Sequence, residues 1–154
     1  MVRVLVSACL LGERVRYDGR DAAAEGDVLA RWNAEGRVVR FCPEVAGGLP
    51  VPRPPAEIRG ASVVTADGTD MTGAFAAGAQ RALEAALANG VRVAVLKENS
   101  PSCGSTHVYD GTFSGTRVPG QGVTAALFAA NGIRVFSERT LAEADAYLAA
   151  METR

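Results

Sequence analysis

The sequence lacks several features that would assign it to common functional classes. Its 154 residues carry no surplus of charge, since 16 Lys and Arg stand against 17 Asp and Glu. That balance argues against a dedicated binder of nucleic acid or of anionic membranes, which needs a basic surface. No uninterrupted apolar run approaches the roughly 20 residues of a transmembrane helix. No Cys-x-x-Cys pair is present, which excludes a zinc ribbon and a thioredoxin-like motif.

The remaining composition is that of an ordinary globular protein. Apolar residues make up 48% of the chain and charged residues 21%, which excludes disorder. A chain of this length builds one core and is too short for two comfortable domains, so we expect a single domain spanning residues 1–154. We also expect a cytoplasmic protein, because thiols stay reduced there and the sequence contains an odd number of cysteines, Cys9, Cys42 and Cys103.

Short β-branched runs alternate with helical patterns along the chain. The runs predict strands at 2–7, 38–41, 62–65, 91–96 and 133–136. Apolar periodicity predicts helices at 27–35, 72–89, 122–130 and 140–151, the last opened by a capping box of Thr140 and Glu143. Such alternation favours parallel pairing with right-handed crossovers. The predicted fold class is therefore a three-layer α/β/α, Rossmann-like domain with a mainly parallel sheet.

Two long loops interrupt this pattern. Residues 43–55 contain five prolines, and residues 100–122 combine prolines with several glycines. Prolines fix their own φ and restrict the preceding residue, so the first loop is expected to be stiff. Long irregular loops in a small domain are usually functional, and we expect the site in these two segments.

Each cysteine follows a predicted strand. Cys9 comes just after the first, Cys42 directly after the second, and Cys103 a few residues beyond the 91–96 strand. In a parallel α/β sheet the carboxyl ends of all strands meet at one edge, where ligand sites form. The three thiols can therefore converge on one site if their strands are near neighbours.

Several interpretations of these thiols remain open on the residues alone. Free cysteines are often simply buried small apolar residues. Three thiolates also suit zinc with one open position, or an iron–sulfur cluster with one iron unligated by protein. A nucleophilic pair of Cys103 and His107 is a further candidate, although it leaves the other two cysteines unexplained.

Three motifs around the cysteines resemble those of a known family. They are SACLLG at 7–12 with VRYDG at 15–19, FCPEV at 41–45 with GGLP at 47–50, and SPSCG at 100–104 with YDGTF at 109–113. Together they are similar to the thiouracil desulfidase (TudS-type) family, long called a domain of unknown function. The resemblance covers nearly the whole chain, and three multi-residue motifs in order make it specific.

The resemblance implies a 4Fe–4S cluster held by Cys9, Cys42 and Cys103. It implies a reaction that removes sulfur from a thiolated nucleobase without net redox change, the substrate sulfur binding the fourth iron. It also implies that Glu44 is the catalytic carboxylate and Ser100 a serine that handles protons. The expected partner is a thiolated small molecule, and intact nucleic acid is not expected.

Other residues near the motifs keep open roles. Ser102 is a second candidate for the proton-handling serine, and Lys97 and Glu98 fit a plain surface pair. The group Arg16, Tyr17, Asp18 and Arg53 suits either substrate binding or bracing of the loops. The competing hypotheses for function are a zinc-dependent hydrolase or deaminase that uses the same cysteines with Glu44, and a non-catalytic cluster or ligand-binding protein.

Overall fold

The computed structural model describes residues 1–24 and 26–153. Its strands are β1 (Val4–Ser7), β2 (Val38–Phe41), β3 (Ala56–Arg59), β4 (Ser62–Thr65), β5 (Val93–Leu96), β6 (His107–Tyr109), β7 (Arg117–Pro119) and β8 (Arg134–Ser137). Its α-helices are α1 (Val28–Ala34), α2 (Pro43–Ala46), α3 (Thr72–Ala88), α4 (Val123–Ala130) and α5 (Leu141–Glu152). Two 3-10 turns, η1 (Ala8–Leu11) and η2 (Glu138–Thr140), follow β1 and β8.

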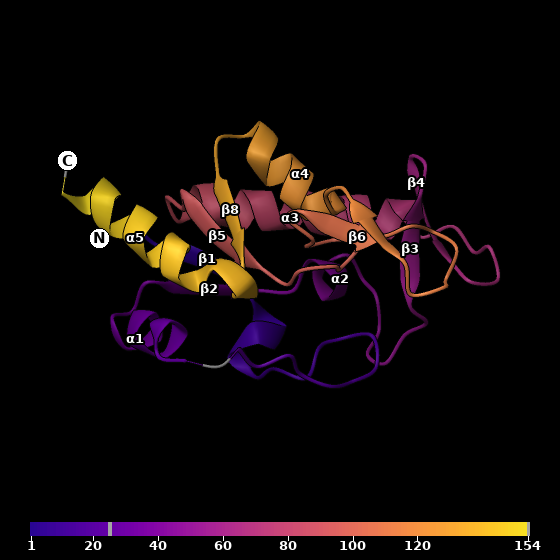
Figure 1. Ribbon diagram of the computed structural model, residues 1–154, viewed down its shortest axis with the longest axis horizontal. Coiled ribbons are helices and arrows are strands. Elements are labelled where there is room, and N and C mark those ends of the chain that lie inside the picture. The colour runs from indigo at the N-terminus through magenta and orange to yellow at the C-terminus, as the bar shows by residue number, and fades with distance from the viewer. Residues whose placement is uncertain (25, 154) are drawn as a thin grey trace.

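Four of these strands form a parallel sheet in the order β2-β1-β5-β8. Each of its strands corresponds to one of the expected β-branched runs. The order places β1 between β2 and β5, which makes the three strands that precede the cysteines direct neighbours. Figure 1 shows the chain termini at one end of the molecule and the small hairpin of β3 and β4 at the other.

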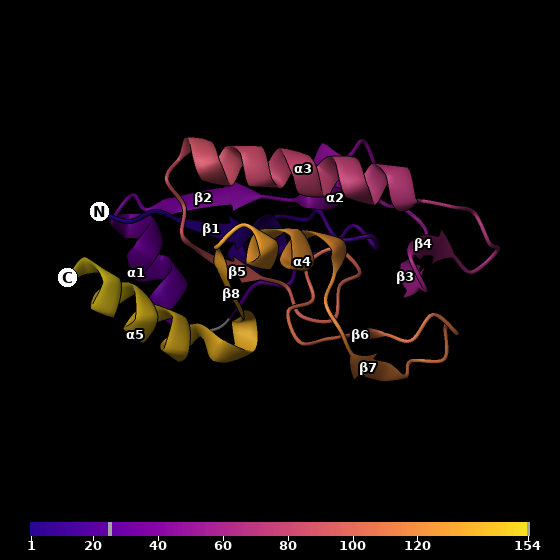
Figure 2. The same cartoon turned by 90° about the horizontal axis from the view of Figure 1, so that it is seen from above.

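Helices cover both faces of this sheet (Figure 2), as expected for an α/β/α domain. On one face, Leu5 and Leu96 pack against α3 and α4 in a cluster that includes Phe128. On the other face, β1 and β5 pack against α1 and α5 in a cluster that includes the fully buried Trp32. Alternate residues of β1 thus point to opposite cores, which explains why this strand is apolar from Val4 to Val6.

Segments outside the sheet depart from the sequence interpretation. The expected strand at 62–65 is β4, which pairs antiparallel with β3 instead of joining the parallel sheet. Gly60, with a φ of 63°, makes the tight connection between the two strands possible. The long loops also contain structure: α2 begins directly after Cys42 with Pro43 in its first turn, and β6 pairs with β7 within the loop 100–122.

The expected capping box at Thr140 and Glu143 is wrong. The Thr140 side chain does not cap α5; it accepts a hydrogen bond from the Ser137 backbone N–H, while Ser137 Oγ accepts from Arg139 N–H. The box therefore belongs to the 3-10 turn η2, because β8 ends at Ser137 and the chain turns there before the helix begins.

Within the described residues, no helix is long and apolar enough to cross a membrane. The carboxyl ends of β1, β2 and β5 lie together at one edge of the sheet, and the loops 43–55 and 100–122 both start from this edge. The fold therefore brings the three sequence motifs to one place.

Candidate active site

The three thiols lie at the carboxyl ends of three adjacent strands. Cys9 is in η1 directly after β1, and Cys42 is the residue that precedes the first turn of α2. Cys103 lies in the loop after β5. All three are free thiols, Cys9 and Cys103 buried and Cys42 partly exposed.

A cavity of about 350 Å³ joins these residues. Cys9, Cys42 and Cys103 line it together with Glu44 and Ser100, so every expected site residue borders the same space. Its remaining lining includes four aromatic side chains, Tyr17, Phe41, Tyr109 and Phe113, and three cations, Arg16, Arg53 and Lys97. Such a mixture of apolar walls and a few polar groups is typical of a small-molecule site.

Burial makes the thiols hard to ionise. The pKa of Cys9 is raised to about 11, first by burial and then by the neighbouring Cys42. That of Cys103 is raised to about 12, again mainly by burial, with Glu44, Cys9 and Cys42 adding repulsion. A lone thiolate nucleophile is therefore disfavoured here, whereas a cationic metal centre would offset the clustered negative charge.

The arrangement of the thiols bears on the kind of metal centre that they could hold. In residues 1–24 and 26–153, no three Cys, His, Asp or Glu side chains come close enough together to hold one ion. A zinc site needs its sulfurs about 2.3 Å from one centre, whereas a cluster binds each thiolate through a different iron. Three separate thiols at one cavity are the donor set that a cluster bound through a different iron at each cysteine would need.

Glu44 stands in the first turn of α2, two residues after Cys42, with its side chain largely buried. Burial raises the pKa of Glu44, against the opposing charge and hydrogen bond of Arg53 and a hydrogen bond from Ser100. Arg53 Nε donates to Glu44 Oε1 at 3.2 Å. A carboxyl with a raised pKa beside a fixed cation is suited to accept and return a proton.

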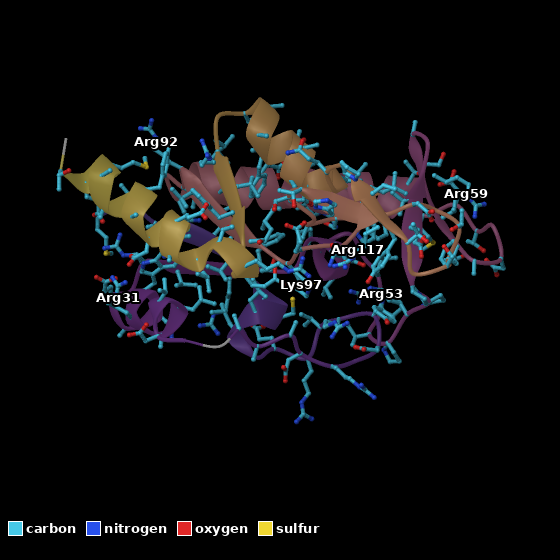
Figure 3. The ribbon with its side chains drawn as sticks, viewed as in Figure 1. Arg31, Arg53, Arg59, Arg92, Lys97 and Arg117 are labelled. Atoms are coloured by element: carbon cyan, nitrogen blue, oxygen red, sulfur yellow. The ribbon has the colours of Figure 1, made fainter. Side chains whose placement is uncertain are left out.

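Arg53 both lines the cavity and braces its loops (Figure 3). Its guanidinium donates to the carbonyls of Pro50 and Val15, and its backbone N–H donates to the carbonyl of Tyr17. Of the two roles that the sequence left open, the structure shows the bracing of the loops: Arg53 ties the loop 12–20 to the loop 43–55, and it also orients Glu44. A role of Arg53 in substrate binding stays a prediction.

The two candidate serines face different surroundings. Ser100 borders the cavity, and its Oγ accepts from the backbone N–H groups of Ser102 and Cys103, each at 3.1 Å. Ser102 is fully buried, and its Oγ lies 2.7 Å from Thr124 Oγ1 on α4. Ser102 thus anchors the loop to α4, and Ser100 is the serine next to Glu44 and the thiols.

Comparison with known proteins agrees with this geometry. The family model described as 2-thiouracil desulfurase matches residues 4–140. The chain belongs to the 2-thiouracil desulfurase family. The resemblance recognised in the sequence motifs is confirmed.

Relatives within the family match over almost the full chain. The uncharacterized protein YbbK of Bacillus subtilis (strain 168) is 45% identical over 148 residues, which cover 90% of this chain and 97% of YbbK. A solved structure of the [4Fe-4S]-dependent thiouracil desulfidase TudS is 51% identical, with a TM-score of 0.96 over 97% of this chain and 99% of that one. The expected α/β/α fold is thereby confirmed as the fold of this desulfurase family.

One residue beside the cysteine site, the hydrogen-bonded Ser7, was not predicted from the sequence. Ser7, at the end of β1, is buried and accepts the backbone N–H of Lys97 at 3.0 Å. That bond aims its hydroxyl at Cys103 Sγ, 3.5 Å away. A serine as the last residue of an otherwise apolar central strand was the available signal.

Two further interpretations from the sequence are wrong. Lys97 and Glu98 are not a surface pair: Lys97 Nζ pairs with Glu138 at 2.9 Å, while Glu98 is only 3% exposed and accepts from the loop 105–107. His107 is exposed, is not among the cavity-lining residues, and bonds through Nδ1 with Thr106. The alternation of β6 turns His107 outward, so the pair with Cys103 does not form.

Proposed function

We propose that this protein is a cluster-dependent desulfidase that converts the thiocarbonyl of a thiolated, nucleobase-like small molecule into a carbonyl and releases hydrosulfide. Cys9, Cys42 and Cys103 hold a 4Fe–4S cluster, and one iron carries no protein ligand. The observation that carries the proposal is the convergence of these three thiols with Glu44 on one cavity of a desulfurase-family fold.

The donor set suits such a cluster. Three thiols come from three adjacent strand ends. Burial raises the pKa of each thiol, and repulsion from neighbouring thiols adds to the pKa of Cys9 and Cys103, which iron would relieve. When bound, the cluster supplies an iron without a protein ligand, a soft Lewis acid that suits a thiocarbonyl sulfur. The 4Fe–4S dependence of the similar TudS enzyme supports the same assignment.

The reaction needs no oxidant or reductant. One C=S bond breaks, one C=O bond forms with the oxygen of water, and the two protons of that water leave with sulfur as hydrogen sulfide or as hydrosulfide and a proton. The protein must therefore take a proton from water and move it to another group. This is general acid–base work, typically contributing about 10²–10⁴-fold to the rate.

Glu44 is the residue placed for that work. Arg53 holds one oxygen of its carboxylate, which fixes the side chain at the cavity wall, and burial raises its pKa so that it accepts a proton more readily. Ser100 lies between Glu44 and the Cys103 segment, since its Oγ accepts from Cys103 N–H while its hydroxyl interacts with Glu44. In this proposal Glu44 deprotonates water, and Ser100 orients Glu44 and relays the proton.

The cavity favours a small partner over intact nucleic acid. Its walls combine aromatic and aliphatic side chains with a few charged ones, its volume suits a single heterocycle, and the chain has no excess of basic residues for phosphate contacts. Three free thiols and an open iron suit the reducing cytoplasm, which we propose as the compartment.

Anaerobic reconstitution with iron and sulfide tests the proposal. The loaded protein is expected to be brown, to absorb broadly at roughly 400 nm through sulfur-to-iron charge transfer, and to release uracil and hydrosulfide in equal amounts from 2-thiouracil. Cys9→Ser, Cys42→Ser and Cys103→Ser should each lose iron and turnover. A zinc-loaded, colourless protein with full activity would overturn the proposal.

The non-catalytic alternative makes an opposite prediction for Glu44. If the cluster were structural, Glu44→Gln would leave every property of the loaded protein unchanged. In our proposal this variant retains its iron and absorption but loses hydrosulfide release.

A further inference from the structure

One sequence motif at the cavity has no part in the chemistry above. The loop 110–116 joins β6 to β7 and contains the second half of the third motif. Phe113, half-buried at its centre, lines the cavity together with Gly115 and with Tyr109 at the end of β6. The loop therefore forms part of the cavity wall.

Phe113 has a backbone conformation that bulky residues avoid. Its φ is +58°, in the left-handed region, where the Cβ of an L-residue crowds the following carbonyl. Asn or Gly would take this conformation more easily. Strain of this kind persists only where surrounding contacts fix it, and it is concentrated at functional sites.

The hairpin of β3 and β4 supplies those contacts. Glu57 Oε1 accepts the backbone N–H groups of both Gly111, at 3.0 Å, and Phe113, at 3.2 Å. One carboxylate on β3 thus determines the conformation of the loop on both sides of residue 112.

Arg59 lies two residues after Glu57 on β3 and holds the same loop. Figure 3 labels its side chain. Its Nε and Nη2 both donate to the Gly111 carbonyl, at 3.1 and 2.7 Å, and its guanidinium carbon lies 6.0 Å from the centre of the Phe113 ring. Gly111 lies so close to β3 that a Cβ there would stand 2.7 Å from the Ile58 carbonyl oxygen. The loop is therefore docked on the hairpin and held rigid.

We propose that Phe113 is a specificity-determining residue whose ring forms the wall on which a planar heterocyclic substrate stacks, and that Glu57 is the positioning residue that holds it there. This inference rests on the proposed desulfidase function and names the residues that select a flat, aromatic thiocarbonyl ring over a saturated or acyclic thioamide. A rigid aromatic wall gains contact with a flat ring at little entropic cost, which gives a strained phenylalanine a use at this position.

Steady-state kinetics of the cluster-loaded enzyme with 2-thiouracil and 5,6-dihydro-2-thiouracil tests the inference. Phe113→Asn removes the ring and relieves the strain, so it should raise KM for 2-thiouracil about tenfold or more while the melting temperature stays equal or rises. The value of kcat should stay within about threefold, because stacking stabilises ground and transition states alike. KM for the saturated analogue should barely change, since its puckered ring stacks poorly.

Conservative variants separate stacking from loop structure. Phe113→Tyr keeps a ring and should restore the KM of the wild type. Glu57→Ala should raise KM for 2-thiouracil by freeing the loop. Glu57→Gln keeps a carbonyl acceptor for both N–H groups, so its KM should lie between those of Glu57→Ala and the wild type. An unchanged KM for 2-thiouracil in Phe113→Asn, or equal losses for both substrates, would overturn the inference.

A binding measurement separates this inference from the proposed function. If wild-type protein carrying the cluster released no hydrosulfide from 2-thiouracil, the desulfidase proposal would fail. Equilibrium dialysis of 2-thiouracil with the wild type and with Phe113→Asn then decides the role of Phe113. Weaker binding by Phe113→Asn than by the wild type supports this role. Equal binding by the two proteins, or no binding by the wild type, overturns it.

Discussion

Arg53 Nε donates to Oε1 of Glu44 across 3.2 Å, and only 4% of the Arg53 side chain is exposed. The same guanidinium satisfies two loop carbonyls, so the group that orients the proposed catalytic carboxylate also holds the cavity wall in place. Orientation of Glu44 and integrity of the wall are therefore coupled.

Arg53→Ala should show this coupling. Removing the cation leaves Glu44 and the carbonyls without their donor in a buried setting, and we expect a loss of about 3 kcal/mol in the free energy of unfolding. Hydrosulfide release should fall at least about tenfold, because Glu44 is no longer held in place. Urea unfolding and a sulfide assay measure the two effects.

Arg16→Ala is the matched control for Arg53→Ala. Arg16 also lines the cavity, but it is more exposed and its pairing with Asp18 is long, at 3.8 Å. A surface pair of this kind contributes about 1 kcal/mol or less. Equal losses of stability in the two variants would contradict the bracing role of Arg53.

Glu44→Gln should separate chemistry from cluster assembly. The amide keeps the size of the side chain but cannot accept a proton, so kcat should fall about 10²–10⁴-fold. Iron content and absorption of the reconstituted variant should match the wild type, since Glu44 is not among the proposed ligands. Retention of more than half of the wild-type kcat would remove Glu44 from the mechanism.

Gly78→Ala should displace the helix that carries Glu44. A Cβ at Gly78 on α3 would lie 1.9 Å from the Pro43 carbonyl oxygen, so α2 must move away. We expect a loss of about 1–3 kcal/mol in the free energy of unfolding, as for other overpacked contacts, together with lower iron content because Cys42 directly precedes α2.

Gly73→Ala provides the control on the same helix. No atom lies within 4 Å of a Cβ at this position in the first turn of α3. Alanine should therefore leave stability unchanged or raise it by up to about 1 kcal/mol through its helix propensity. If Gly78→Ala behaved like Gly73→Ala in unfolding and iron binding, the close α2–α3 packing would not be what positions the site.

Glu98 should make the stability of the apoprotein sensitive to acid. Burial alone would raise its pKa, but hydrogen bonds from the Ser105 hydroxyl and from the Thr106 and His107 amides hold the pKa at about 2. A glutamate in the unfolded chain titrates at about 4.3, so the unfolded state binds the proton first as the pH falls. The stabilisation by Glu98 is therefore complete at neutral pH and is lost between about 4 and 2.

Glu98→Gln should remove this acid dependence. The variant is expected to be less stable at pH 7 by about 1–3 kcal/mol, because an amide cannot accept all the bonds made by the carboxylate. The difference in the free energy of unfolding between this variant and the wild type should shrink as the pH is lowered from about 4. Glu84→Gln, at an exposed position on α3, should show neither effect. Parallel unfolding curves of wild type and Glu98→Gln across this range would contradict the assignment.

The sheet and the cysteine site were predictable from the sequence because they depend on local patterns. Three of the four β-branched runs of the sheet end at a motif or a few residues before one, and parallel topology then brings Cys9, Cys42 and Cys103 to one edge. What the sequence could not supply was the order of the strands, which decides whether those ends are neighbours.

Contacts between distant segments were not predictable. Arg53 meets Glu44 through a turn of the proline-rich loop, and Glu57 meets the loop 110–116 across more than 50 residues. Lys97 and Glu98 are adjacent in sequence, yet the end of β5 directs them to different partners, Glu138 and the 105–107 amides. Polar residues in loops have many local alternatives, so tertiary packing selects their partners.

The most direct test of the account is hydrosulfide release from 2-thiouracil as a function of the iron bound per chain, measured anaerobically during stepwise reconstitution. We expect no release by the apoprotein, release that rises in proportion to cluster content, and none after iron is replaced by zinc. Release that is independent of iron, or that is restored by zinc alone, would contradict it.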